Sequence, residues 1–293
     1  MSQTPQNPLN LALAVVTHES KPWLDAFFAT WQSAVAQAQI APPPVYVADS
    51  GSRDDTRETA ARLCPAASVI TCGNIGYGAA ANRAINRSTE DWILLCNPDV
   101  TFPADFLTGL AQVLAHPIGQ AGAYAPRLLN PDGSAQPSVG QWPTLLRVLM
   151  DQRRKRPDRK YVRTPPQTTA PIDWAMGACL LLHRERVRSV GGFDERFFLY
   201  VEEVDLLRRL AKQGYPTIYV PDLALTHHRP NASRDVQPEV QRYAARGQLR
   251  YFAKHGSWLG LRAFGLLGAL AGRLRLGEAL ALRQTILKRP TGP

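Results

Sequence analysis

Three acidic side chains stand close together late in the sequence, at Glu202, Glu203 and Asp205. Apolar residues recur after them at helical spacing, which predicts a helix from about Val201 to Gln213 with these acids in its first turn. Successive helical residues point about 100° apart, so one carboxylate can face a pocket while the next faces solvent or a cation. Such a carboxylate can act as a general base. The alternative is that all three acids only complement the helix dipole.

Polar residues also follow three apolar segments, in the runs Thr17-His18-Glu19, Asp49-Ser50-Gly51-Ser52 and Asn97-Pro98-Asp99. A carboxylate such as Asp99, emerging where a buried strand ends, can bind a hard divalent cation and leave room for a diphosphate. Asp49 has the same placement and can accept hydrogen bonds from a nucleobase or a ribose. For both residues the alternative is a purely structural turn.

A glycine-rich segment, GNIGYG over residues 73–78, opens a predicted helix that carries Asn82. A loop of this kind lets the backbone approach phosphates at a helix N-terminus. The segment lacks the spacing of a dinucleotide-binding loop and the Gly-Lys-Ser/Thr of a P-loop, so those two sites are disfavoured. Tight packing of the helix on a sheet is the alternative.

Two adjacent histidines, His227 and His228, follow another predicted strand, IYVPDLAL. A neutral imidazole at this position can complete a metal site with Asp99, and a protonated one can contact a phosphate. A lone histidine is usually structural, but two in sequence followed by Arg229 favour a functional role.

Strands and helices alternate through the first hundred residues and must position these side chains. Apolar runs predict strands over residues 9–16, 42–50, 68–71 and 91–96, and the segments between them predict helices over 22–40, 54–63 and 78–88. This alternation favours a parallel sheet with helices on both faces. The carboxyl ends of parallel strands meet at one edge, which is where open α/β sheets bind ligands.

Beyond residue 120 the pattern changes to short strands and loops. A basic, Pro-rich insert over 151–171 is expected to be mobile and is a candidate lid; the strand ACLLLH and helices over 236–293 follow. We expect residues 1–120 and 121–235 to form the two halves of one domain. Residues 236–293 are expected to form a basic helical extension.

The chain has 293 residues, 45% of them hydrophobic and 20% charged, enough for one large α/β domain or two smaller ones. Its four cysteines show no C-x-x-C pair and no zinc-ligand spacing, which favours a reduced, cytosolic environment. The N-terminal residues lack the charged region and the long apolar run of a signal peptide. No segment reaches the ~18 uninterrupted apolar residues of a membrane span.

The net charge of +10 is concentrated at the C-terminal end, where residues 241–293 hold ten Lys or Arg and one acid, Glu278. A basic tail on a nearly neutral domain does not fit an evenly basic nucleic-acid binder, and no nucleic-acid motif accompanies it. The stretch Trp258–Leu276 alternates apolar clusters with arginines, which favours a helix lying on an anionic membrane. A helical cap on the domain, or a homodimer contact, is the alternative.

Taken in order, these motifs resemble the family 2 glycosyltransferases of the GT-A fold, in particular the rhamnosyltransferase-like branch. The resemblance runs from about Leu11 to Arg234 and is carried by VVTHES, VADSGSRDDT, NIGYGAAANRA, LLCNPDV, DWAMGACLLLHRE, GGFDERFFLYVEEVDLLRRLAKQG and the late THH. It implies a Rossmann-like α/β fold whose mostly parallel central sheet carries helices on both faces. It also implies that residues 1–120 bind a nucleotide-sugar donor at the strand edge and that residues 121–235 bind the acceptor.

The resemblance implies ligand roles for individual residues. The family's metal motif falls on Asn97-Pro98-Asp99, where Asn97 replaces the first carboxylate. Asp99 and His227, with His228 as the fallback, would then hold Mg²⁺ or Mn²⁺. The nucleotide-sugar site would comprise Thr17, Glu19, Asp49, Asn74, Gly76, Gly78, Asn82, Asn97, Asp99, Trp174 and Gly177.

The family's catalytic acid pair falls on Glu202 and Glu203, and Glu203, a Glu where Asp is usual, would be the general base. An inverting transfer needs such a carboxylate to deprotonate the acceptor hydroxyl while a cation offsets charge on the departing diphosphate. We expect transfer of L-rhamnose from dTDP-rhamnose to a lipid-linked or polysaccharide acceptor in cell-envelope glycan synthesis, at the cytoplasmic face of the membrane. The alternatives are a UDP-sugar donor (hexosyl, galactofuranosyl or N-acetylhexosaminyl) and a catalytically silent scaffold, suggested by Asn97 and Glu203.

Overall fold

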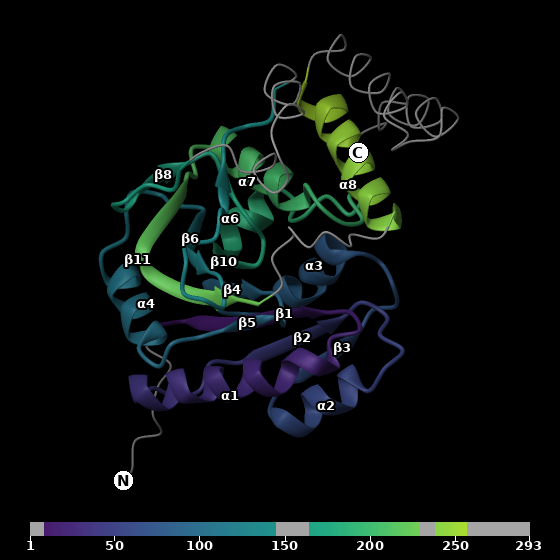
Figure 1. The fold of residues 1–293 in the computed structure, drawn as a ribbon. Helices are drawn as coiled ribbons and strands as arrows, with labels where there is room; N and C mark the ends of the chain where they lie inside the picture. Colours follow the sequence, from purple (N-terminus) through teal and green to yellow (C-terminus); the bar gives the residue numbers. More distant parts are fainter. Residues whose placement is uncertain (1–8, 145–163, 229–237, 257–293) are drawn as a thin grey trace.

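A computed structural model of the chain describes residues 9–144, 164–228 and 238–256 (Figure 1). Most of the basic insert predicted over 151–171 lies outside the described residues, as does the membrane-surface helix predicted over Trp258–Leu276. The described part of the extension is the helix Pro238–His255. Among the helices that the structure describes, none combines the length and the apolar character needed to cross a membrane.

The first hundred residues form four strands and three helices in strict alternation. The elements are β1 (Leu11–Thr17), α1 (Lys21–Ala38), β2 (Val45–Asp49), α2 (Thr56–Leu63), β3 (Ser68–Thr71), α3 (Tyr77–Arg87) and β4 (Trp92–Cys96). These four strands are parallel to one another, in the order β3-β2-β1-β4. The predicted parallel sheet is therefore confirmed in this half of the chain.

The second half of the chain widens the same sheet with strands of both directions. Its elements are β5 (Val100–Thr101), α4 (Phe106–Ala115), β6 (Ala123–Leu129), β7 (Val139–Gly140), β8 (Ala170–Ile172), β9 (Trp174–Ala175), β10 (Cys179–His183), α6 (Arg184–Ser189), α7 (Glu202–Lys212), β11 (Thr217–His227) and α8 (Pro238–His255). The sheet continues β4-β10-β6-β11-β5, and β10 runs antiparallel to both of its neighbours. A short second sheet pairs β7 with β9.

Side chains of β1 alternate between two hydrophobic cores, one on each face of the sheet. Leu11, Leu13 and Val15 pack with the aromatic residues of α1, whereas the small Ala12 and Ala14 pack with the alanines of α3. Figure 1 shows α1 and α2 on one face and α3 and α7 on the other. This period-two alternation fixes which residues end at the strand edge.

The acid-bearing helix α7 begins and ends within a residue of its prediction. Val204, Leu207 and Leu210 are buried as expected, and Gly214, at φ +81°, follows the helix end. Ala211, predicted on the same apolar face, is exposed instead, because it lies at the margin of the buried stripe.

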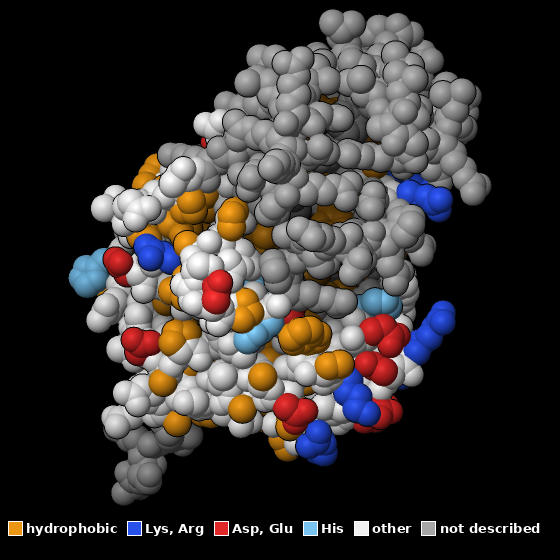
Figure 2. Space-filling model, in the orientation of Figure 1, with side chains coloured by type: hydrophobic (Ala, Val, Ile, Leu, Met, Phe, Trp, Pro, Cys, Tyr) orange, Lys and Arg blue, Asp and Glu red, His pale blue; other side chains and the backbone are white. Residues whose placement is uncertain are grey.

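Over α1 and α2 the surface carries acidic and basic side chains side by side (Figure 2). Two of the pairs are Lys21 with Asp55 and Arg62 with Asp25. This mixture gives no single-sign field over that part of the molecule, in keeping with the near-neutral charge of the first 240 residues.

Candidate functional site

The carboxyl ends of β1 and β2 bring Thr17 and Asp49 together, as the alternating strands predict. The two residues lie opposite one another in the parallel register, and Thr17 Oγ1 donates to Asp49 Oδ2 at 3.0 Å. The buried Asp49 carboxylate also accepts hydrogen bonds from the backbone N–H and the hydroxyl of Ser52. Asp49 therefore fixes the turn after β2, and its contact with a nucleotide stays a prediction.

Glu19 joins the loop after β1 to the loop after β2. Its backbone is left-handed, at φ +50°, and its N–H donates to Ser52 Oγ at 2.9 Å. The exposed side chain accepts a hydrogen bond from the N–H of Arg53 at 2.8 Å through Oε1. These contacts lock the two loops into one rim of the strand edge.

The glycine-rich loop continues this rim because two glycines permit close backbone contacts. A Cβ on Gly51 would lie 2.6 Å from the backbone nitrogen of Asn74, and a Cβ on Gly76 would clash with the carbonyl oxygen of Phe198. Both glycines have positive φ values. Asn74 is exposed on this rim, while Gly78 is buried under the ring of Phe193.

Asn82 lies apart from these residues and joins α3 to the loop before α7. Its Nδ2 donates to the carbonyl oxygen of Phe193 at 2.9 Å, and its Oδ1 accepts from the Phe193 N–H at 2.8 Å. A second Nδ2 contact reaches Glu195 at 3.1 Å. Both halves of the amide are thus used within the protein, and a sugar-nucleotide contact stays a prediction.

Asp99 and His227 are brought together by the pairing of β5 with the end of β11. Val100 lies opposite His227 in this antiparallel pair. His227 Nε2 lies 3.5 Å from Asp99 Oδ1, and only 2% of the His227 side chain and 11% of the Asp99 side chain are exposed. Two groups that bind divalent cations therefore converge where β4 ends.

Gln136, which sequence reasoning missed, sets the orientation of this imidazole. Its Nε2 donates to Asn130 Oδ1 at 2.9 Å, so its Oε1 is left to accept from His227 Nδ1 at 2.7 Å. In the tautomer that donates this hydrogen bond, Nδ1 carries the proton, and Nε2, which faces Asp99, is the nitrogen that can bind a cation. Metal-binding histidines are commonly oriented in this way by a second hydrogen bond.

The Asp99–His227 pair fits a divalent cation. Asp99 Oδ1 is buried, and within the described residues it has no hydrogen-bond partner. The pair provides two protein ligands, and the described ranges contain no group of three His, Cys, Asp or Glu that could hold a metal by itself. His228 instead contacts Thr101 Oγ1 through Nε2 at 2.8 Å, so the structure favours His227 over its neighbour.

Glu202 and Glu203 lie in the first turn of α7 and are 5% and 4% exposed. The two residues before them, Tyr200 and Val201, have φ values of +69° and +72°. A left-handed backbone is strained for any residue with a Cβ, above all for β-branched Val, and costs on the order of 1–3 kcal/mol per residue. Strain of this kind is often found at functional sites.

Tyr77, also missed from the sequence, connects the glycine-rich loop to these acids. Its Oη donates to the carbonyl oxygen of Gly177 at 2.9 Å, and a Cβ on Gly177 would lie 3.5 Å from Glu203 Cβ. Burial, reinforced by the charges of Glu202 and Glu203, raises the pKa of Tyr77 well above 10.0, so the hydroxyl stays protonated.

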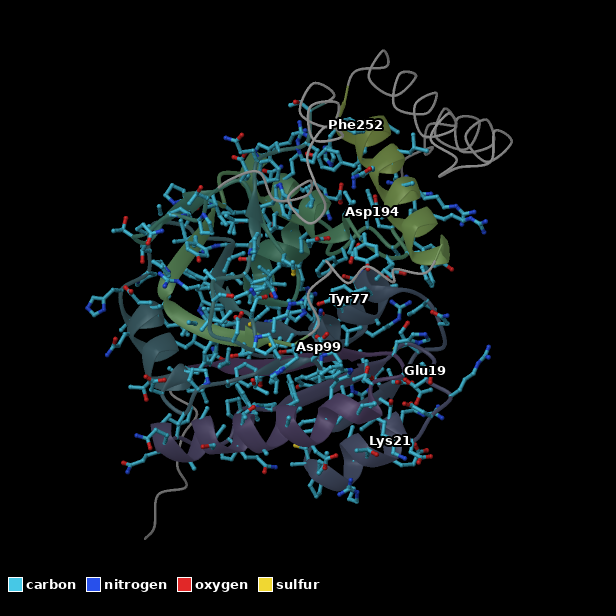
Figure 3. All side chains as sticks on the ribbon, viewed as in Figure 1. Glu19, Lys21, Tyr77, Asp99, Asp194 and Phe252 are labelled. Atoms are coloured by element: carbon cyan, nitrogen blue, oxygen red, sulfur yellow. The ribbon has the colours of Figure 1, made fainter. Side chains whose placement is uncertain are left out.

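Gly177 and Ala178 form a short turn, which also contacts the end of β4. The N–H of Asn97 donates to the carbonyl oxygen of Ala178 at 2.9 Å, one residue from Gly177. Residues 177–178 therefore lie close both to Glu203 of α7 and to Asn97, which is two residues before Asp99. Figure 3 labels Asp99, after β4, and Tyr77, at the start of α3, in the central part of the molecule.

Trp174 lies three residues before this turn and is held in the protein interior. It is 2% exposed, its Nε1 donates to the carbonyl oxygen of Gln141 at 2.8 Å, and its ring lies against Gly140 of β7. Gly140 has no side chain, and a Cβ there would clash with the indole. In the structure Trp174 therefore acts as packing, and a direct contact with the donor sugar stays a prediction.

Asp205, the third acid of the cluster, is fully buried and belongs to a different set of contacts. It pairs with Arg209 at 2.8 Å, with Lys254 at 2.9 Å and with His255 at 2.7 Å. Burial alone would raise the pKa of Asp205, but the hydrogen bond from His255 and the charges of Arg209 and Lys254 outweigh it and lower the pKa. Asp205 therefore ties α7 to α8.

Comparison with known proteins identifies the family of this chain. Residues 14–170 match the family described as Glycosyl transferase family 2. The chain is 33% identical to the N-acetylglucosaminyl-diphospho-decaprenol L-rhamnosyltransferase of Mycobacterium tuberculosis, over 94% of this chain and 95% of the relative. It is 24% identical to the rhamnosyltransferase WbbL of Escherichia coli, over 63% of this chain and 73% of the relative.

A solved structure supports the fold. The mannosyltransferase PcManGT from Pyrobaculum calidifontis, in complex with GDP-Man and Mn²⁺, superposes with a TM-score of 0.55 at 17% identity, covering 99% of this chain and 84% of that one. The predicted GT-A architecture is confirmed by this likeness. The family match over residues 14–170 and the 33% identity to the mycobacterial relative show that the chain belongs to glycosyltransferase family 2.

Proposed function

We propose that this glycosyltransferase transfers L-rhamnose from dTDP-rhamnose, with inversion, to a polyprenyl-diphosphate-linked acceptor in cell-envelope glycan synthesis. The observation that carries the proposal is that Glu203 lies beside Gly177, while Asn97, two residues before Asp99 of the Asp99–His227 pair, donates a hydrogen bond to Ala178. The donor sugar and the acceptor rest on the printed activity of the mycobacterial relative, which matches nearly the full chain.

Glu203 is the proposed general base. It takes the proton of the acceptor hydroxyl as that oxygen bonds to C1 of the sugar and the bond from C1 to the diphosphate oxygen breaks. The acceptor oxygen attacks opposite the leaving group, so one displacement inverts the anomeric centre. A second catalytic carboxylate is not required for this route, and Glu202 is proposed to support its neighbour.

Asp99 and His227 would hold the Mg²⁺ or Mn²⁺ ion. When bound, the cation offsets the negative charge that builds up on the leaving diphosphate. Since the protein pair supplies two ligands, oxygens of the donor diphosphate are proposed to supply others. Thr17, Asp49 and Asn74 lie along the rim that would receive the nucleotide.

A lipid-linked acceptor fits the charge distribution of the chain. Residues 241–293 carry ten basic residues and one acid, and anionic membrane surfaces attract such segments. We propose that this segment brings the enzyme to the cytoplasmic face of the membrane, where the acceptor lies.

Thermal unfolding in the presence of dTDP, UDP or GDP tests the donor, each with Mn²⁺ or with EDTA. A nucleotide present at a hundred times its Kd should stabilise the protein by about 2.7 kcal/mol. We expect dTDP with Mn²⁺ to stabilise it most, and transfer from dTDP-rhamnose to a polyprenyl-diphosphate-linked N-acetylglucosamine acceptor to follow.

Other outcomes would change the proposal in defined ways. Preference for UDP would keep the mechanism but replace the sugar. No response to any nucleotide would favour a catalytically silent scaffold, the alternative suggested by Asn97 in place of the usual first carboxylate.

A further inference from the structure

Helix α8 lies beyond the region matched by the family model and packs against the segment that leads into α7. The ring of Tyr243 lies 4.6 Å from that of Phe198, and the side chains of Arg250 and Lys254 lie over the ring of Phe197. Figure 1 shows α8 beside this segment. The helix therefore packs directly against the residues that precede α7.

Gly247 makes the closest of these contacts. A Cβ at Gly247 would lie 2.5 Å from the carbonyl oxygen of Tyr200 and 3.3 Å from Cγ2 of Val201. Because the first of these atoms belongs to the backbone, a side chain here would push the whole turn aside. Only glycine lets α8 approach so closely.

The turn that Gly247 contacts is the strained pair Tyr200 and Val201. Its left-handed backbone leads directly into Glu202 and Glu203, and the N–H of Asp205 donates to the carbonyl oxygen of Val201 at 3.0 Å. A backbone of this kind persists only where its surroundings hold it in place. The direction in which Glu203 points is therefore tied to whatever fixes this turn.

A second anchor lies one helical turn further along α7. The buried Asp205 accepts contacts from Lys254 at 2.9 Å and His255 at 2.7 Å, both on α8, and Lys254 also contacts Asp194 at 2.7 Å. Helix α8 therefore contacts this region at two points. Gly247 meets residues 200–201, just before the two glutamates, and Lys254 meets Asp205, just after them.

We propose that Gly247 and Lys254 are positioning residues for the general base, so that α8 is a working part of the active site as well as the beginning of the basic extension. The proposal rests on the role assigned to Glu203 under the proposed function. Neither residue touches the substrates; both act by fixing the turn from which the base projects.

The test compares Gly247→Ala with a matched helical control, Gly109→Ala. Gly109 lies in α4, where an added Cβ would meet only Leu223 Cδ1 at 3.5 Å, an ordinary contact. We expect Gly247→Ala to lower kcat by about tenfold to a hundredfold, the range in which a small misplacement of a reacting group acts. The KM for the donor and the stabilisation by its nucleotide should stay as in the wild type, and Gly109→Ala should change neither kcat nor KM.

Hydrogen exchange of the amides of residues 200–206 provides a readout that does not depend on turnover. Faster exchange in Gly247→Ala and in Lys254→Met, with recovery in Lys254→Arg, is the expected result. Unchanged kcat and exchange in Gly247→Ala would overturn the proposal, and so would a parallel loss of nucleotide binding, which would indicate general damage. If the wild type transfers no rhamnose, the proposed function fails, while the exchange data still decide whether α8 holds the turn.

Discussion

The hydroxyl of Tyr77 donates a 2.9 Å hydrogen bond to the carbonyl oxygen of Gly177, although 100 residues separate the two in the chain. This bond joins the loop expected to lie beside the donor diphosphate to the turn that contacts Glu203. One hydroxyl group therefore links two segments that lie far apart in the sequence.

Removing that hydroxyl should weaken both stability and turnover. Tyr77→Phe keeps the ring packed edge-on against Phe193 but deletes the hydrogen bond, and we expect the free energy of unfolding to fall by about 0.5–1.5 kcal/mol. The control is Tyr124→Phe, which deletes a comparable hydrogen bond from the N–H of Ile118 at 3.0 Å, away from the site. Chemical denaturation and steady-state kinetics check both variants. If kcat falls equally in the two, Tyr77 has only a structural role.

Glu203→Gln should abolish most of the turnover without loss of donor binding. A general base contributes about 10²–10⁴ in rate, so kcat should fall by that factor while dTDP with Mn²⁺ still stabilises the protein. Glu202→Gln, the neighbouring control with nearly the same burial, should lose far less. Equal losses in the two variants would contradict the assignment of the base to Glu203.

The metal assignment predicts an order among three variants. His227→Ala should remove the Mn²⁺-dependent part of the nucleotide stabilisation, because a ligand is lost. Gln136→Ala should weaken metal affinity by about 10–100-fold, since the imidazole loses its orienting partner. His228→Ala should leave the Mn²⁺ titration unchanged, and a shift there would show that the wrong histidine was assigned.

Acid should destabilise the protein through the contact between α7 and α8. Burial lowers the pKa of His255 below 6.5, more than the hydrogen bond to Asp205 raises it. The unfolded chain therefore takes up the proton first, and the free energy of unfolding should fall as the pH drops through about 6.5. The lowered pKa of Asp205 has the same sign: its stabilisation is present above the ordinary value of 3.8 and is lost as the pH falls through the folded pKa.

Denaturation curves between pH 7.5 and pH 5 would measure this slope. His255→Gln should flatten it, whereas His116→Gln, at an exposed position after α4, should not. A slope that is unchanged in His255→Gln would place the sensitive group elsewhere.

Much of the fold follows from local patterns in the sequence. Alternating strands and helices predict the parallel order of β1 to β4, and the polar residues that end β1 and β2 meet as expected, with Thr17 opposite Asp49. The direction of β10 could not be predicted, because a continuous apolar run such as CLLLH suits a buried strand of either direction.

The missing parts of the site have a different cause. Gln136 lies 91 residues from His227, and no local pattern marks a glutamine as the partner of a distant imidazole. Tyr77 is one aromatic residue in a glycine-rich loop, which alone indicates packing. Both roles exist only after the sheet has brought the segments together.

The antiparallel strand β10 also has a consequence for the nascent chain. The Sγ atoms of Cys96, at the end of β4, and Cys179, at the start of β10, lie 3.5 Å apart, yet 83 positions separate the two residues along the polypeptide. During synthesis β4 cannot form this pairing until the residues of β10 have been added to the chain, and the edge of β4 that β10 covers is open until then. An open edge of this kind is prone to pairing with other chains. The hydrogen bond from Asn97 to Ala178 lies at the same edge, so the turn beside Glu203 gains this contact only when β10 is in place.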